Sequence, residues 1–437
     1  MLSSASSEER AATPTPRSSA VSLQWFWDAP SSARRGLFAA WLGWLLDAFD
    51  VMLYALVLPV LITDFSLSKG MAGLLGSLTL VASGFGGILF GMIADRYGRR
   101  PALMGSLLVY SVFTFACGLS TTVWHLGVFR FLLGLGMGGE WTSGAALVSE
   151  TWPDEHRAKA MGLMQCAWSI GYAAAALVVA LVLPRLGWRA VFFIGILPAF
   201  FALWIRRGIE ESPEWSRSRT VRRDWVTPVR AIFSPAYLGF TLLLTVLSAS
   251  TIFAYWGLNL WIPAYLSLPE AQGGVGLAAA VATSLVVLIQ FGAFLGYVSF
   301  GFVADAIGRR RSFLLYILTA AVLVLGFGHL RSPWVLALVG PLTTLFGTGF
   351  FSGFGAVTAE LYPTAIRATA LGFTLNVGRT ASALAPFIVG SLAQTQGFAT
   401  AFAVLAVALL VGASTWIWLP ESRGWSVAAP ARTTAAI

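Results

Sequence analysis

The sequence predicts an all-α membrane protein with twelve transmembrane helices in two pseudo-symmetric six-helix bundles. Two observations lead to this fold class: an apolar composition and a set of motifs that occurs twice. Of the 437 residues, 57% are hydrophobic and only 11% are charged, and the mean hydropathy is +0.77. Soluble domains carry about 25% charged residues. A chain this poor in charge is expected to lie in lipid.

The duplication is the strongest signal in the sequence. The stretch GMIADRYGRR at 91–100 returns as GFVADAIGRR at 301–310, shifted by 210 residues. The Glu-x6-Arg pattern in ETWPDEHR returns with the same shift in ELYPTAIR, and ESPEW returns as ESRGW. Three signatures in the same order and at the same spacing predict two structurally equivalent halves.

Runs of about 20 mostly apolar residues locate the helices. In the first half, we expect helices at 37–62, 71–94, 101–120, 123–149, 159–183 and 188–206. In the second half, we expect them at 236–266, 277–304, 312–329, 333–359, 367–394 and 398–419. Six helices per half agree with the repeat.

Outside these helices the composition becomes polar. The N-terminal stretch is rich in Ser, Ala, Pro and Thr and lacks the apolar core of a signal peptide. Residues 1–36 are therefore predicted to form a disordered cytoplasmic tail. The two bundles are expected at 37–206 and 235–420, joined by a polar, basic cytoplasmic linker at 207–234. Residues 421–437 would form a second cytoplasmic tail.

The positions of lysine and arginine predict the orientation. If the N-terminus is cytoplasmic, 22 of the 28 Lys and Arg residues fall in cytoplasmic segments. The opposite side holds only Lys69, Arg185, Arg189 and Arg331. This asymmetry predicts a multi-pass protein of the cell inner membrane with both termini cytoplasmic. The formal charge of +9 then reflects contact with anionic lipid head groups and not with nucleic acid.

Two glycine motifs have a structural interpretation. Gly134, Gly136 and Gly139 match the G-x-G-x-x-G pattern of dinucleotide sites, but they lie inside an apolar helix with no preceding strand. We therefore expect them to allow close packing between helices. Gly98 lies in a short link between two helices, where a tight turn needs a positive φ.

The repeated motifs also point to a family. The doubled G-x-x-x-D-x-x-G-R-R and Glu-x6-Arg signatures resemble those of the major facilitator superfamily, over about residues 37–425. LDAFD at 46–50, GLGMGGEW at 134–141, VSETWP and LNVGR at 375–379 are similar to the proton symporters for sialic acid and for monocarboxylates such as lactate. Aromatic-acid proton symporters are close relatives of these. The resemblance implies a central cavity lined by helices 1, 4, 7 and 10, with alternating access by rocking of the halves.

Asp47 and Asp50 are the most costly residues of the first predicted helix. Their i, i+3 spacing puts both on one helix face, roughly 15–20 Å deep by the rise of the helix. A charged aspartate near the bilayer centre costs about 2.5–3.5 kcal/mol. Low dielectric favours a neutral carboxyl group, and two adjacent carboxylates resist ionising together. A proton carrier needs this condition; the alternative is a structural pair satisfied by neighbouring polar groups.

Three further ionisable residues fall inside predicted helices. Arg379 lies at a similar depth, where its guanidinium could bind a substrate carboxylate through two hydrogen bonds. The alternative is a permanent ion pair with Asp47 or Asp50. Arg130 and Glu140 are also too costly to face lipid. Glu140 is a second candidate proton site and Arg130 a candidate for substrate contact or gating, with structural pairing as the alternative for both.

By analogy with the family, charged residues at the cytoplasmic helix ends are expected to act as gates. Asp95 would stabilise the positive N-terminal end of a helix of the other half and so hold the inner side closed. A solvated turn is the alternative. The expected gating residues are Asp95, Arg99, Arg100, Glu150 and Arg157, with Asp305, Arg309, Arg310, Glu360 and Arg367 as their counterparts.

Polar and aromatic residues inside the helices are candidates for lining the cavity. Besides Arg379 and Arg130, the expected substrate-binding residues are Gln165, Trp168, Tyr255, Trp256, Asn259 and Asn376. For the aromatic ones, the alternative is packing or anchoring at the membrane interface.

These residues predict a proton-coupled symporter that imports a small organic acid anion: a monocarboxylate, sialic acid, or an aromatic or muconate-type carboxylate. Its partners would be that acid, protons and the lipid bilayer, and it would act as a monomer. A proton-driven efflux antiporter is the alternative within the same fold, and a membrane sensor or receptor is the alternative of another class. The sequence has no metal-ligand cluster and no nucleophile with a partnered base, so we expect no enzyme activity, metal or cofactor.

Overall fold

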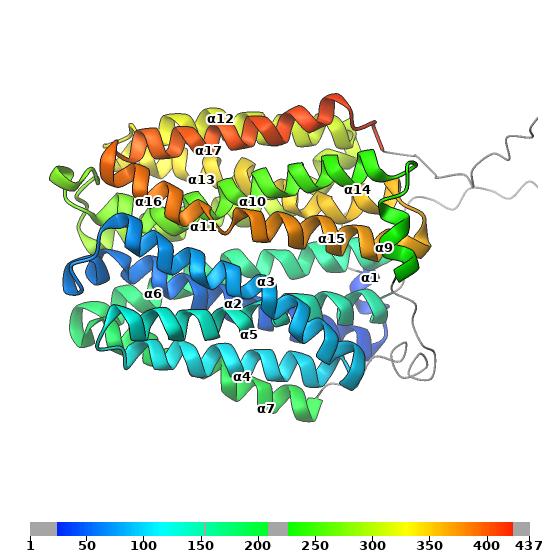
Figure 1. The fold of residues 1–437 in the computed structure, drawn as a ribbon, viewed down its shortest axis with the longest axis horizontal. Coiled ribbons are helices and arrows are strands. Elements are labelled where there is room, and N and C mark those ends of the chain that lie inside the picture. The colour runs from blue at the N-terminus through cyan, green and yellow to red at the C-terminus, as the bar shows by residue number, and fades with distance from the viewer. Residues whose placement is uncertain (1–23, 153, 209–225, 423–437) are drawn as a thin grey trace, which may run out of the picture.

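The fold is known from a computed structural model that describes residues 24–152, 154–208 and 226–422. Every regular element within these ranges is a helix, as the predicted fold class requires. The helices run along the long axis of the molecule (Figure 1).

The helices are named in chain order. The N-terminal half contains α1 (Gln24–Trp27), α2 (Ser31–Asp64), α3 (Lys69–Tyr97), α4 (Arg99–Gly118), α5 (Val123–Thr151), α6 (Asp154–Ile194) and α7 (Leu197–Gly208). The C-terminal half contains α9 (Val226–Ile232), α10 (Leu238–Ser267), α11 (Ala279–Ile307), α12 (Arg309–Phe327), α13 (Pro333–Gly349), α14 (Phe354–Leu361), α15 (Thr364–Ser382), α16 (Ala385–Thr395) and α17 (Phe398–Ser414). Short 3₁₀ helices cover Glu270–Gln272 (η1), Phe350–Gly353 (η2) and Thr415–Ile417 (η3).

The helices provide twelve membrane spans. Nine stretches of the described residues are long and apolar enough to cross a membrane, and one of them covers Lys159–Phe201. That stretch contains two spans, because α6 is broken beyond Pro184 at Gly187, where φ is 76°. The other two spans are α5 and the pair α15–α16, which is interrupted just before Pro386. Six spans in each half confirm the predicted fold class.

The two halves repeat each other in backbone detail. Gly98 joins α3 to α4 with φ 114° and ψ 160°, and Gly308 joins α11 to α12 with φ 96° and ψ 162°. Residues with a Cβ rarely adopt such a positive φ. Both links therefore require glycine, as expected for Gly98.

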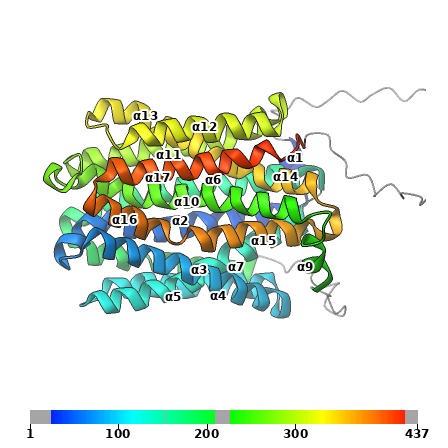
Figure 2. The same cartoon turned by 45° about the horizontal axis from the view of Figure 1, so that its top comes forward.

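Figures 1 and 2 show the N-terminal half on one side of the molecule and the C-terminal half on the other. The links α3–α4 and α11–α12 lie at the same end as α1 and α9, which we call the terminal end. The links α2–α3, α4–α5 and α10–α11 lie at the opposite end, which we call the distal end. Between the halves, α2, α3 and α6 contact α10, α16 and α11, respectively.

The start of the first bundle differs from the predicted boundary at residue 37. Trp25 of α1 packs against Trp152 with ring centroids 5.3 Å apart. Trp152 Nε1 also donates a hydrogen bond to the backbone oxygen of Ala33 at 3.0 Å. These contacts hold the segment before residue 37 onto the bundle, so the first transmembrane helix already begins at Ser31.

The expected linker is also helical in part, since α9 covers its end at Val226–Ile232. Residues 1–23, 209–225 and 423–437, which include most of the predicted tails and linker, lie outside the described residues. The ESPEW motif belongs to the second of these ranges.

Gly134, Gly136 and Gly139 of α5 lie where neighbouring helices approach closely. A Cβ at Gly134 would collide with the backbone of Thr79 on α3, and one at Gly136 with the backbone of Tyr110 on α4. A Cβ at Gly139 would enter an aromatic ring of α3. The interpretation of this motif as a packing motif is confirmed.

Gly136→Ala is expected to destabilise the fold, because the added methyl group would lie 2.6 Å from the backbone nitrogen of Tyr110. Overpacking of this kind costs about 1–3 kcal/mol. Gly162→Ala is the matched control, since a Cβ there meets no described atom within 4 Å and alanine favours a helix over glycine. The thermal midpoint of the purified protein in detergent should fall for the first variant and hold or rise for the second. Equal midpoints would contradict the packing role.

Candidate functional site

Asp47 and Glu140 meet across two helices of the N-terminal half. Asp47 lies on α2 and Glu140 on α5, and neither side chain is exposed. The Glu140 carboxylate packs against Gly43, one turn before Asp47 on α2, so closely that any Cβ at Gly43 would collide with it. The absence of a side chain at Gly43 therefore lets Glu140 reach α2.

Arg379 joins them from the C-terminal half. It lies in the last turn of α15, where the helix dipole favours a cation. Its guanidinium interacts electrostatically with both Asp47 and Glu140. Two carboxyl groups and one guanidinium thus come together where the two halves meet. We call Asp47, Glu140 and Arg379 the charge triad.

Three carboxyl groups of the N-terminal half have no hydrogen-bond partner among the described residues: Asp47, Asp50 and Glu140. An ionised carboxylate in such a place is far more costly than a neutral carboxyl group. Each can therefore be held there only while a nearby cation or a bound proton balances its charge.

Asp50 has different surroundings from Asp47. Its carboxyl group lies beside Thr114 and Tyr110 of α4, inside the N-terminal half. The Thr114 hydroxyl already donates to the Tyr110 backbone oxygen at 2.8 Å. The two aspartates interact with each other, and Asp47 also interacts with the arginine of the other half.

Arg130 is buried on α5, apart from the charge triad. Its guanidinium carbon lies 3.8 Å from the centroid of the Tyr54 ring, a close cation–π contact. Cys117 is a second neighbour. The Tyr54 hydroxyl donates to the Ala72 backbone oxygen at 2.7 Å, so the ring is fixed in place. The structure therefore places Arg130 in the interior of the N-terminal half and not beside Arg379.

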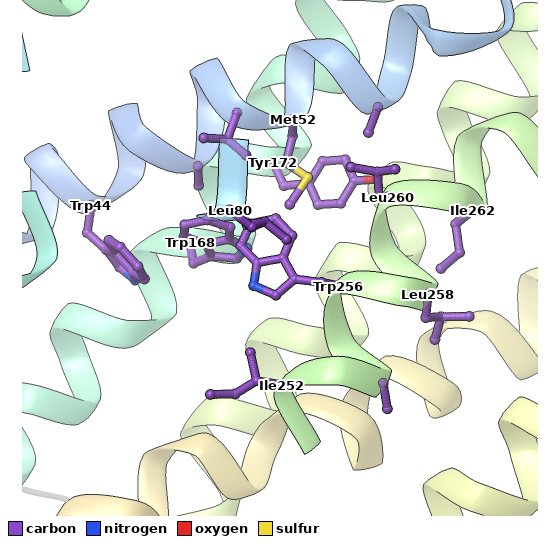
Figure 3. Packing of buried hydrophobic residues seen from close by; sticks show 14 of the residues in the cluster. Trp44, Met52, Leu80, Trp168, Tyr172, Ile252, Trp256, Leu258, Leu260 and Ile262 are labelled. Atoms are coloured by element: carbon purple, nitrogen blue, oxygen red, sulfur yellow. The ribbon is translucent and has the colours of Figure 1, made fainter. Parts of the chain in front are cut away.

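Aromatic rings from both halves pack beside the charge triad. Trp168 of α6 lies 4.6 Å from Trp44 of α2, 5.8 Å from Trp256 and 6.4 Å from Tyr255 of α10, measured between ring centroids. Figure 3 shows Trp44, Trp168 and Trp256 directed toward one another. Trp44 is not among the residues predicted from the sequence, although its position one turn before Asp47 indicates a place near the site.

The polar candidates are largely bound to their own helices. Asn259 donates to the Tyr255 backbone oxygen at 3.1 Å and accepts a long hydrogen bond from Gln290 at 3.4 Å. Asn376, half-buried on α15, donates to the Gly372 backbone oxygen at 2.8 Å. Gln165 is half-buried on α6, one turn before Trp168.

Lys69 connects the two halves at the distal end. Lys69 lies in the first turn of α3, and its Nζ donates to two backbone oxygens of the C-terminal half. One is that of Gln272 in η1, and the other is that of Ala393 in the last turn of α16, at 3.3 Å. Its backbone N–H donates to Gln394 Oε1 at 3.2 Å. A lysine at a helix C-terminus satisfies carbonyls that have no partner within the helix. Lys69 and its partners Gln272, Ala393 and Gln394 also line a cavity of about 470 Å³ that opens at this end.

A charge cluster in the C-terminal half lies at the terminal end. Arg309 forms ion pairs with Asp305 at 2.7 Å and with Glu360 at 3.1 Å. Ser422 donates to the other Glu360 oxygen at 2.6 Å. Arg309 is thus in contact with both Asp305 and Glu360, all three of which were predicted as gating residues.

The glutamate of the repeated ESRGW motif completes this cluster. Glu421 accepts hydrogen bonds from the backbone N–H groups of Arg309 at 2.7 Å and Arg310 at 3.2 Å, at the positive N-terminal end of α12. Arg367 is half-buried on α15, and its Nε has no hydrogen-bond partner among the described residues. These contacts connect elements of one half.

The corresponding cluster of the N-terminal half is seen only in part. Arg99 is buried and Arg100 is half-buried, both at the start of α4. The side chains of Asp95, Glu150 and Arg157 lie outside the described part of the chain.

Two repeated six-helix bundles with ionisable groups buried between them define a secondary membrane transporter. The chain belongs to the Major Facilitator Superfamily, whose family model matches residues 40–289 and 266–436.

The relatives span nearly the whole chain. A Haemophilus influenzae protein, named provisionally as a metabolite transport protein, is 34% identical to this chain. The match covers 89% of this chain and 97% of the relative. A cis,cis-muconate transport protein of Acinetobacter baylyi is 31% identical, covering 85% and 90%. A sialic acid transporter of Escherichia coli is 30% identical, covering 90% and 96%.

A solved structure supports the fold. The xylose transporter of Escherichia coli, in a partially occluded inward-open conformation, superposes with a TM-score of 0.74 at 20% sequence identity. The match covers 91% of this chain and all of that one. At this identity the likeness concerns the fold alone.

Lys69→Met is expected to loosen the distal end, because methionine keeps an apolar stem but loses the bonds to Gln272 and Ala393. Hydrogen bonds to a charged group are worth about 1.5–3 kcal/mol, so opening of this end should become about tenfold easier or more. A cysteine placed at Ser77, which is buried on α3, would report opening as faster labelling by a thiol reagent.

The control for this experiment is Lys159→Met, which removes an exposed lysine at the other end of the bundle. It should leave the labelling rate unchanged. If Lys69→Met also leaves it unchanged, Lys69 does not hold the distal end closed.

Proposed function

We propose that this chain is a proton-coupled symporter that imports a small organic acid anion by alternating access. The convergence of Asp47 and Glu140 from one half with Arg379 from the other carries the proposal. Residues of opposite charge at the contact between the halves can respond both to a ligand and to the relative position of the halves. The transport of sialic acid and of cis,cis-muconate by relatives supports a carboxylate as the substrate.

Charge balance within the charge triad couples the binding of the substrate to the uptake of a proton. With one carboxyl group ionised beside Arg379, the triad is neutral. A monoanionic substrate bound at Arg379 adds one negative charge, which is neutralised when the remaining carboxylate takes up a proton. Only the empty and the doubly loaded triad are then neutral, and a neutral site is the least costly one to enclose away from water.

This scheme sets the driving force. One proton moving with one monoanion transfers no net charge, so the pH gradient alone drives uptake. A further proton would add about 2.3 kcal/mol per 100 mV of membrane potential. Asp50, buried beside Tyr110, is the candidate to carry it.

The remaining candidates have subordinate roles in this proposal. Trp168, Tyr255 and Trp256 form part of the binding site, and Asn259 and Asn376 orient it through their hydrogen bonds. Arg130 supports α2 through Tyr54. The terminal end faces the cytoplasm with its arginines, and its charge clusters act as the inner gate.

Arg379→Gln should weaken carboxylate binding, because glutamine keeps hydrogen-bonding ability but loses the positive charge. Loss of a charge-assisted bond of about 1.5–3 kcal/mol corresponds to an affinity about ten- to hundredfold lower. Isothermal titration on the detergent-purified protein would measure it. Arg185→Gln, an exposed arginine at the distal end, is the control and should bind normally. Unchanged affinity in Arg379→Gln would remove this residue from the anion site.

Asp47→Asn should abolish accumulation driven by an acid-outside pH gradient, since asparagine cannot take up the proton. Exchange of labelled for unlabelled substrate needs no net proton movement and should persist. Both are measured by uptake into proteoliposomes, with the exposed Asp28→Asn as control. Accumulation that survives the Asp47 change would assign the proton to another group. Expulsion of the substrate under the same gradient in the unaltered protein would instead favour an antiporter.

A further inference from the structure

Three polar groups in the aromatic cluster beside the charge triad are left unsatisfied by the described part of the chain. Trp44 Nε1, Trp168 Nε1 and the Tyr255 hydroxyl are buried, and none has a hydrogen-bond partner among the described residues. The Tyr255 hydroxyl lies beside the Trp168 indole without forming a well-aligned bond to it. A buried polar group left without a partner is destabilising. Three of them in one cluster indicate a ligand that accepts hydrogen bonds.

The cluster offers this ligand donors and flat apolar surfaces. An indole N–H only donates. The neighbouring Asn259 amide is already engaged on both sides, since it donates to the Tyr255 backbone oxygen and its own oxygen accepts from Gln290. A polyhydroxylated acid presents many O–H donors and would need several acceptors. A simple carboxylate presents acceptors only, so it matches the groups that this cluster leaves open.

The ring geometry favours a planar body for that carboxylate. Trp44 and Trp168 belong to the N-terminal half, whereas Tyr255 and Trp256 belong to the C-terminal half. Trp168 contacts both Tyr255 and Trp256, and Figure 3 shows Trp168 beside Trp256. When a ligand enters between the halves, these contacts must be replaced. A flat conjugated ring can restore them by stacking or by edge-to-face contact. A saturated ring or a short hydroxy acid cannot.

The position of the charge triad limits the charge of the ligand. Trp44 and Asp47 lie one turn apart on the same face of α2, about 4.5 Å along the helix axis. The carboxylate of a ligand seated on Trp44 therefore reaches toward Arg379, which interacts with Asp47. Among the described residues, Arg379 is the cation that interacts with the carboxyl groups of the triad, whereas Arg130 is held over Tyr54. One cation matches one carboxylate.

We propose that the substrate is a planar aromatic monocarboxylate, bound with its ring between Trp44 and Trp168 of one half and Tyr255 and Trp256 of the other, and with its carboxylate at Arg379. This rests on the proposed function and narrows it. Trp44, Trp168 and Tyr255 then determine specificity by donating to the ligand, and the aromatic contacts between the halves form around it.

The test compares four probes by titration calorimetry: benzoate, cyclohexanecarboxylate, lactate and N-acetylneuraminate. Benzoate and cyclohexanecarboxylate have the same charge and nearly the same size, and differ in planarity and conjugation. Benzoate is expected to bind at least about fivefold more tightly than any other probe. Equal or tighter binding of cyclohexanecarboxylate, lactate or N-acetylneuraminate would overturn the proposal.

Variants that keep the ring but remove the donor test the individual residues. Trp168→Phe and Tyr255→Phe should each weaken benzoate binding about fivefold or more. Trp124→Phe is the matched control, because Trp124 is 84% exposed on the outside of the bundle; it should bind as the unaltered protein does. Unchanged affinity in both donor variants would rule out the assigned contacts.

Uptake separates this inference from the proposed function. If proteoliposomes accumulate lactate or N-acetylneuraminate under an acid-outside gradient, beyond protein-free vesicles, and benzoate does not bind, the symporter proposal stands and the aromatic substrate is wrong. If benzoate binds but none of the four acids is accumulated under the gradient, the site is correctly assigned and the proton-coupled import is wrong.

Discussion

The high cost of an unbalanced charge far from water governs this structure. Asp47, Asp50, Glu140 and Arg130 are all buried within the bundles, where each would be unfavourable alone. The chain tolerates them because α2 is surrounded by protein along most of its length and because Arg379 approaches from the other half. The same requirement for charge balance gives the site its chemistry, because a bound proton raises the net charge of the site and a bound carboxylate lowers it.

Close helix packing is what allows these charges to meet. Glycine occupies positions where neighbouring helices approach closely. Examples are Gly43, where Glu140 reaches α2, and Gly136, where α5 touches α4. Gly171 has the same role on α6, where a Cβ would collide with the Leu45 backbone of α2. Small residues at helix contacts are general in membrane bundles. Here they set the distance between carboxyl groups on separate helices.

The two ends of the bundle are held by different means. At the distal end, Lys69 of the N-terminal half bonds to carbonyl oxygens of the C-terminal half. At the terminal end, the described charge contacts around Arg309 stay within the C-terminal half. Between the ends, tryptophan rings of both halves meet beside the charge triad. A ligand entering there would act on the relative position of the halves, which is how binding energy can be coupled to rocking of the bundles.

The sequence by itself determined the fold class, the repeat and the identity of the ionisable residues. Apolar runs must form helices in lipid, and the shift between GMIADRYGRR and GFVADAIGRR is a property of the chain alone. Helix periodicity also placed Asp47 and Asp50 on one face. It could not give their partners, because partners on other helices depend on how helices pack. Only the tertiary structure separated Asp50, beside Thr114, from Asp47, beside Glu140 and Arg379, and only it placed Trp44 against Trp168. Those contacts arise because glycines let neighbouring helices pack closely and because the two halves meet. Neither can be read from the spacing of residues within one helix.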